Sequence, residues 1–112
     1  MKNGLIKVAA AIPAVKVADT KFNLIETEKQ IAVADGQGVE IIVFPELSLT
    51  GYSCQDLFQQ QLLLDDAEQS VLRLLEFTRQ LDITVIVGAP VTVGPLLLNC
   101  AIVIQQGKLL GI

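Results

Sequence analysis

The residues with the clearest chemical potential form one stretch, which runs from Phe44 to Tyr52 with the sequence FPELSLTGY. The four apolar residues Ile41–Phe44 are mostly β-branched, which predicts the end of a strand buried on both faces. Pro45 lacks a backbone donor and should end that strand. Glu46 follows at once, and a carboxylate at the tip of a buried strand is costly without a purpose. We interpret Glu46 as a candidate general base, the alternative being an ordinary strand end whose carboxylate points into water.

Few other side chains could take part in covalent chemistry. The chain has no histidine, which excludes a Ser-His-Asp or Cys-His arrangement and a zinc–histidine motif within these residues. Cys54 has no basic residue near it in sequence, so we expect an inert, buried thiol rather than a nucleophile. Cys100 lies in an apolar strand and is predicted to be core, and Lys108 to belong to a hairpin.

Composition limits the class of protein further. The 112 residues correspond to one ordinary domain, 52% of them are hydrophobic, and the mean hydropathy is +0.56. No apolar run reaches the roughly 18 residues that a membrane span needs, so the excess predicts strands covered on both faces, or a surface covered by something else. A net charge of -4 and a pI near 4.6 argue against nucleic acid or an anionic membrane as partner. Two cysteines and no signal-peptide pattern favour the cytoplasm.

The first half of the chain predicts a strand, a helix and a second strand. Residues 5–12 are rich in Ile, Val and Ala and should form the first buried strand, which Pro13 ends. Asp19 or Thr20 can cap a helix that ends at residues 35–38, and residues 39–44 form the next strand. This order is typical of an α/β protein with a parallel or mixed sheet. The helix side that should face the sheet contains Leu24, Ile25, Glu28, Ile31, Ala32 and Asp35.

The second half predicts another helix and several strands. A short helical turn over residues 53–58 should precede a helix that starts at Asp65 and Asp66 and ends near Leu81. Residues 82–88 form a third buried strand, which Ala89-Pro90 should turn, and Gly94-Pro95 indicates a short hairpin within residues 91–98. Strands 99–105 and 108–112 should be joined by the two-residue loop Gln106-Gly107. The helix should bury Ala67, Val71, Leu74, Leu75 and Thr78, and expose the charges of Glu68, Arg73, Glu76 and Arg79.

The last predicted strand reaches Ile112, the final residue, which would leave an edge of the sheet unpaired. With the apolar excess, this favours part of a larger protein. The alternative is a small, complete α/β domain with a short final strand.

Three groups of motifs, taken together, resemble the nitrilase, or carbon-nitrogen hydrolase, superfamily. They are Phe44–Leu47 with Thr50–Tyr52, then Val87–Pro90, then Asn99–Ala101 with Gly107–Gly111. The branch most similar in detail is the N-terminal glutaminase domain of glutamine-dependent NAD synthetases. The residues behind this finer resemblance are Leu49–Ser53, Gln55–Leu57, Leu62–Leu64 and Asn99–Ile104.

The resemblance implies a nitrilase-type αββα sandwich, a mixed sheet flanked by two helices, of which residues 1–112 form the N-terminal part. It also implies a Glu-Lys-Cys catalytic triad, in which Glu46 is the general base. Tyr52 would border the glutamine pocket or the ammonia path, or its ring would pack under the loop. The triad lysine and cysteine would lie beyond this chain, because Lys108, Cys54 and Cys100 do not match them. The 112 residues alone should therefore not hydrolyse glutamine.

The implied parent reaction is glutamine hydrolysis that supplies ammonia to an ATP-activated carboxylate. The chain itself would need no cofactor, whereas ATP and Mg would serve a C-terminal synthetase domain; we find no Gly-rich phosphate loop here. Glutamine, that domain and further copies of the protein are the expected partners, with no nucleic acid and no membrane. Two alternatives stay open: another nitrilase-type amidase, such as an omega-amidase or a carbamoyl-amide hydrolase, or a non-catalytic scaffold domain.

Overall fold

The computed structural model describes residues 4–52 and 60–112, and within them the strands form one mixed sheet. The order of strands across the sheet is the order along the chain. β1, β2 and β3 are parallel, and β4 and β5 add as antiparallel neighbours. The strands are β1 (Val8–Ala10), β2 (Ile41–Val43), β3 (Thr84–Val93), β4 (Leu96–Gln105) and β5 (Lys108–Gly111). The α/β class is therefore confirmed.

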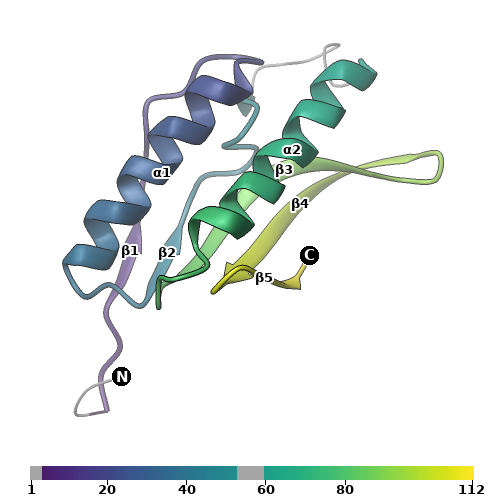
Figure 1. The fold of residues 1–112 in the computed structure, drawn as a ribbon. Coiled ribbons are helices and arrows are strands. Elements are labelled where there is room, and N and C mark those ends of the chain that lie inside the picture. Colours follow the sequence, from purple (N-terminus) through teal and green to yellow (C-terminus); the bar gives the residue numbers. More distant parts are fainter. Residues whose placement is uncertain (1–3, 53–59) are drawn as a thin grey trace.

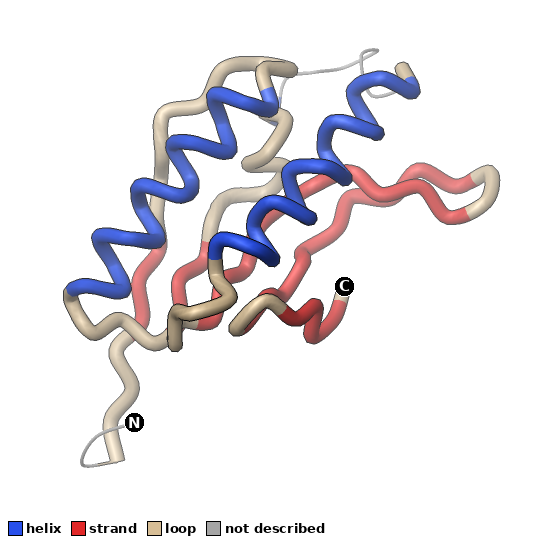
Figure 2. The backbone as a smooth tube through the Cα atoms, viewed as in Figure 1, coloured by secondary structure: helices blue, strands red, loops and turns tan. Residues whose placement is uncertain are grey.

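The two helices of the described chain, α1 (Thr20–Gly36) and α2 (Gln61–Phe77), lie side by side on one face of the sheet (Figures 1 and 2). The predicted start of α1 is confirmed, because the Asp19 carboxylate caps it by accepting a bond from Phe22 N at 3.1 Å. α2 starts at Gln61, earlier than the predicted Asp65, and ends at Phe77 rather than near Leu81. The turn predicted over residues 53–58 lies outside the described residues.

The buried side of α1 is more polar than its apolar periodicity predicts. Ile25, predicted to face the sheet, is 53% exposed, whereas Asn23 and Thr27 are buried. The Thr27 hydroxyl donates to the Asn23 carbonyl at 2.8 Å, so its burial leaves no hydrogen bond unmade. In α2 the prediction is closer: Ala67, Leu74 and Thr78 are buried, and the four predicted surface charges are exposed.

The hydrophobic core lies between the helices and the sheet, and the opposite face of the sheet is open. Along that open face Ala10, Val43, Ile86 and Val103 lie in register on four neighbouring strands. Val43 is 42% exposed and Val8 61%. Of the two predicted explanations for the apolar excess, strands covered on both faces are not found among the described residues, whose sheet has one helical layer. The other, a surface covered by something else, stays a prediction. The fully buried side chains of the core include Ile31, Ile42, Leu74, Ile83, Val85 and Ile104.

β3 and β4 form one long hairpin, which corrects the prediction of a turn at Ala89-Pro90. β3 continues through Pro90, which lies opposite Asn99 in the ladder, and the chain turns only at Gly94-Pro95. Proline is tolerated there because β2 pairs with β3 only as far as Ile86. The loop after β2 bonds to β3 once more at Gly88, and beyond Gly88 the described residues give that side of β3 no further backbone partner, so no donor is needed at Pro90. The hairpin extends past the helical layer (Figure 1).

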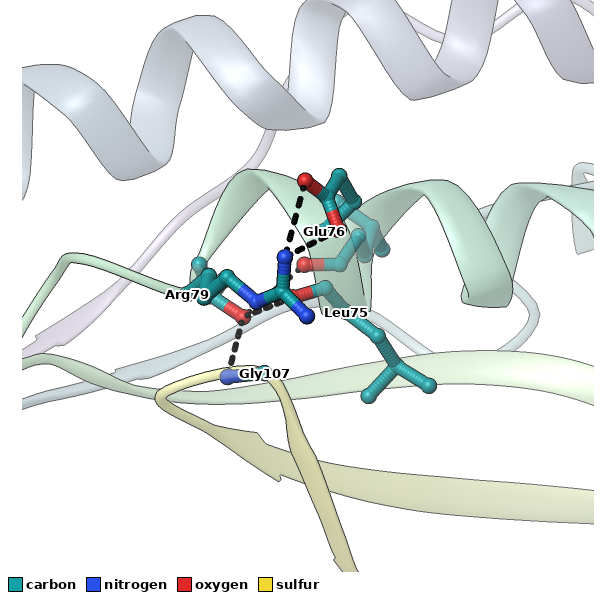
Figure 3. Close-up of polar contacts among 6 residues, drawn as sticks. Leu75, Glu76, Arg79 and Gly107 are labelled. Atoms are coloured by element: carbon teal, nitrogen blue, oxygen red, sulfur yellow. Dashed lines mark hydrogen bonds and ion pairs between the residues drawn. The ribbon is translucent and has the colours of Figure 1, made fainter.

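The turn between β4 and β5 docks on the end of α2, as Figure 3 shows. Gln106 and Gly107 both have positive φ, at 48° and 77°, which confirms the predicted two-residue hairpin loop. Gly107 N donates to the Thr78 hydroxyl at 3.3 Å, and that hydroxyl donates to Leu74 O at 2.9 Å. A Cβ on Gly107 would stand 3.1 Å from Leu75 O. The start of β5 is thus fastened to the helix layer.

We expect the 112-residue chain to self-associate through the open face, because its exposed Val8 and Val43 and its partly exposed Ile86 and Val103 favour burial. Light scattering should show assemblies that grow with concentration, and the Val43→Lys variant should reduce them. Val33→Lys on the outer side of α1 is the matched control, since Val33 is also exposed but lies in a helix. A monomer at high concentration would contradict this prediction.

Candidate active site

Glu46 lies just past the carboxyl end of β2, where the backbone of residues 45–47 crosses next to β3 at Gly88. An added Cβ on Gly88 would stand 2.3 Å from Leu47 N and 2.7 Å from Pro45 O. No side chain fits at such distances, so only glycine at this position of β3 lets the Glu46 backbone approach. Carboxyl ends of parallel strands are where open α/β sheets commonly bind ligands.

Backbone hydrogen bonds fasten the loop after Glu46 to the same part of β3. Leu49 N donates to Gly88 O at 3.1 Å, and Gly88 N donates to the Ser48 hydroxyl at 3.3 Å. The loop then tightens on itself, with Gly51 N donating to Leu47 O at 2.8 Å. Leu47 has a φ of 53°, a conformation uncommon for a non-glycine residue. The geometry of the Glu46 backbone is thus set from both sides.

Asn23 on α1 connects this loop to the segment before the helix. Its amide nitrogen donates to Leu49 O at 3.0 Å and to Lys16 O at 2.9 Å, and its oxygen accepts from Lys16 N at 2.8 Å. The side chain is 1% exposed. One buried amide therefore fixes the loop after Glu46 relative to the helical layer.

The Asn23→Ala variant should lose about 2–4 kcal/mol of unfolding free energy, because it removes the hydrogen-bond partner of the buried Leu49 carbonyl and of the partly buried Lys16 N–H. Urea unfolding would measure the loss. Gln30→Ala is the matched control, since Gln30 is an exposed amide on the same helix. Equal stabilities of the two variants would show that the loop does not depend on Asn23.

The Glu46 side chain is exposed, so the expected burial of this carboxylate is not found. It is nevertheless held, because the Asn99 amide nitrogen donates a hydrogen bond to Glu46 Oε1. The two residues line a hollow of about 280 Å³ together with Val43, Ile86, Gly88 and Ala101. Cys100 packs toward the helices, and side chains alternate along a strand, so Asn99 belongs to the open face. Glu46 therefore lies at the edge of the open face.

Not all of the other residues singled out from the sequence lie near Glu46. Tyr52, six residues after Glu46, is 70% exposed, so its ring does not pack beneath the loop. Cys100 is partly buried against the core, as predicted, on the face away from Glu46. Lys108 pairs with Gln105 and so lies about 20 Å along β4 from Asn99. Its assignment to the hairpin is confirmed, whereas Cys54 lies outside the described residues.

Gly88 and Asn99 are the two site residues to which sequence reasoning gave no role. Both fall within motifs on which the family resemblance rests, and those motifs are the one sequence feature that could have indicated a role for them. A glycine in a strand can also mark a close approach of backbone, but the partner that approaches cannot be read from the pattern.

No metal site forms among the residues the structure describes. No three His, Cys, Asp or Glu side chains gather there in a way that could bind a metal ion. A second hollow, of about 270 Å³ between α2 and strands β3 and β4, is lined almost entirely by apolar side chains. Neither α1 nor α2 is long and apolar enough to cross a bilayer.

The sequence model of the carbon-nitrogen hydrolase family matches residues 7–112. The chain belongs to this family. Glu46 and its loop lie inside the matched region, together with Gly88 and Asn99.

Among curated relatives, the chain is similar to glutamine-dependent NAD(+) synthetases. It is 32% identical to that of Mycobacterium leprae over 109 residues, and 39% identical to that of Aquifex aeolicus over 87 residues. The first alignment covers 97% of this chain and 16% of the relative, the second 76% and 15%. The chain thus spans about a sixth of the length of these relatives.

Solved structures agree on the fold. An NAD+ synthetase from Acinetobacter baumannii, in complex with ADP, superposes with a TM-score of 0.87 at 28% identity, covering 95% of this chain and 20% of that one. An amidase from Nesterenkonia superposes with a TM-score of 0.84 at 21% identity, covering 99% and 43%. The sheet with one helical layer is accordingly compatible with part of a nitrilase fold, which confirms the predicted fold class.

Proposed function

We propose that this chain forms the N-terminal part of the glutamine-hydrolysing domain of a glutamine-dependent NAD synthetase. The observation that carries the proposal is the placement of Glu46, whose backbone is fixed against Gly88 and whose carboxylate is held by Asn99 at the edge of the open face. Similarity to NAD synthetases over nearly the whole chain supports the choice of branch.

In this proposal Glu46 is the general base of a thiol-dependent amide hydrolysis. It takes the proton of a cysteine thiol, the thiolate attacks the side-chain amide carbon of glutamine, and loss of ammonia leaves a thioester that water hydrolyses. A cation stabilises the oxyanion that forms in each step. The Cys100 side chain packs against the core on the helix side of the sheet, and Lys108 lies about 20 Å along β4 from Asn99, so neither is placed for these two roles. In line with the family resemblance, the proposal assigns the thiol and the cation to parts of the full-length protein beyond these 112 residues.

In this proposal the ammonia is used by a synthetase domain that activates a carboxylate with ATP and Mg; the names of the relatives state glutamine dependence and NAD synthesis. In this proposal that step takes place in the synthetase domain; among the residues described here, no three His, Cys, Asp or Glu side chains could hold a metal ion. Tyr52, exposed on the same loop, is proposed to border the glutamine pocket or the ammonia path. We further expect the parent to be a homo-oligomer in the cytoplasm, where free thiols persist.

The test is to purify the full-length protein that contains this chain and to supply either glutamine or ammonium as the nitrogen source. NAD formation from both, with glutamate released from glutamine, is the expected result. Glutamine or other amide hydrolysis without NAD formation would point instead to a different amidase of the family. Absence of any amide hydrolysis would overturn the proposal in favour of a scaffold role.

A further inference from the structure

We propose that Asn99 is a positioning residue, which holds the Glu46 carboxylate in the orientation that proton transfer requires. The inference rests on the proposed function, since it concerns the same reaction. It adds to the site a residue of β4 that lies 53 positions after Glu46 in the chain.

The geometry supplies one fixed donor for one carboxylate oxygen. Asn99 lies opposite Pro90 in the β3–β4 ladder, so its backbone is held by a regular strand. An ionised carboxylate can only accept hydrogen bonds, so the amide nitrogen of Asn99 must face it. Glu46 Oε1 takes this bond, and among the described residues no partner for Oε2 is found. Oε2 is therefore the oxygen left to accept a proton.

The backbone contacts of the loop cannot by themselves orient the Glu46 carboxylate. Gly88 and Ser48 fix where the Glu46 backbone runs, but a glutamate side chain has three further rotatable bonds. An exposed side chain of this kind samples many rotamers, and ordering it costs conformational entropy. A charge-assisted hydrogen bond from a strand residue offsets that cost before substrate arrives. Proton transfer needs the base within hydrogen-bond distance, so a pre-oriented carboxylate should raise the rate.

This role differs from that of an ordinary surface hydrogen bond in what it predicts. A positioning residue changes the turnover number and leaves the binding of glutamine nearly unchanged, and it matters only while Glu46 can act as a base. A structural residue would lower stability, and would affect NAD synthesis from ammonium as much as from glutamine.

The experiment uses the full-length protein and the Asn99→Leu variant, which has no donor. We expect kcat for glutamine hydrolysis to fall roughly 10- to 100-fold, the effect of losing one hydrogen bond to a charged group, with KM changed little. The Asn99→Asp variant keeps the side-chain shape but repels the Glu46 carboxylate, so its kcat should fall at least as far. If Asn99→Leu does not fold, this variant tests the inference in its place. Gln105→Leu removes an amide at the other end of β4 and should leave kcat unchanged.

A double variant separates positioning from structure. In the Glu46→Gln background, Asn99→Leu should cause no further loss of hydrolysis, because two residues that act as a unit are not additive. Unchanged hydrolysis in both Asn99 variants, or an additive loss in the double variant, overturns the inference while the proposed function stands. Loss of ammonium-dependent synthesis or of thermal stability with Asn99→Asp also overturns it. If the wild-type protein hydrolyses no glutamine, the proposed function itself is wrong.

Discussion

The Glu46→Gln variant of the full-length protein is expected to lose glutamine hydrolysis by roughly 10²- to 10⁴-fold, the contribution of a general base. Glutamine is nearly the same size as glutamate but cannot accept a proton at neutral pH. NAD synthesis from ammonium should survive, because in the proposed function the carboxylate acts only in the release of ammonia. Parallel assays with glutamine and with ammonium measure both effects on one preparation.

The matched control for this variant is Glu76→Gln, which neutralises an exposed carboxylate on α2 that pairs with Arg79 at 3.4 Å. It should leave both activities at the wild-type level, because such surface pairs contribute little. If Glu46→Gln lost both activities together, Glu46 would be a structural residue. If neither activity changed, the general base would have to be sought elsewhere.

Gly88→Ala is expected to destabilise the protein by about 3 kcal/mol or more, at the upper end of overpacking effects. The new methyl group would stand 2.3 Å from Leu47 N and 3.0 Å from the Glu46 carbonyl carbon. Both neighbours are backbone atoms, and hydrogen bonds on either side of Gly88 hold them in place. Either β3 separates from the loop or the loop shifts Glu46, so glutamine hydrolysis should fall together with the unfolding free energy.

Gly111→Ala is the control for Gly88→Ala, because Gly111 also lies in a strand but a Cβ there meets no atom within 4 Å. Urea unfolding of both variants gives the comparison, with the effect of Gly111→Ala expected within about 0.5 kcal/mol of zero. Equal unfolding free energies for the two variants would mean that the loop around Glu46 moves aside at little cost. The close approach of this loop to Gly88 would then not determine the position of Glu46.

The sequence was a good guide wherever a local signal decides the structure. Asp19 at the start of α1, Gly94-Pro95 at the tip of the long hairpin and Gln106-Gly107 at the short one all act within a few residues. The predicted position of Glu46 directly after β2 follows from the same kind of signal, a proline that ends an apolar run. These elements were predicted because neighbours in sequence determine them.

The sequence was a poor guide where distant residues decide. Pro90 was read as a turn, although the early end of β2 leaves a side of β3 on which a proline is tolerated. No local pattern marks Asn23, because its buried side chain is stabilised by hydrogen bonds to the carbonyl groups of Lys16 and Leu49, which lie elsewhere in the chain. The contact of Asn99 with Glu46 depends on the register of β4, which no single segment encodes.

The strand order has a consequence for how the protein is made. Because each strand pairs with the one before it in the chain, every strand finds its partner already synthesised when it leaves the ribosome. The β3–β4 and β4–β5 hairpins close short loops, which favours rapid pairing, whereas the parallel pairs among β1, β2 and β3 close much longer ones. Glu46 would meet Gly88 as soon as β3 is translated, and Asn99 would join them with the next hairpin. In nascent chains of increasing length, the backbone contact of Glu46 with Gly88 should therefore form first, and the side-chain contact of Asn99 with Glu46 second.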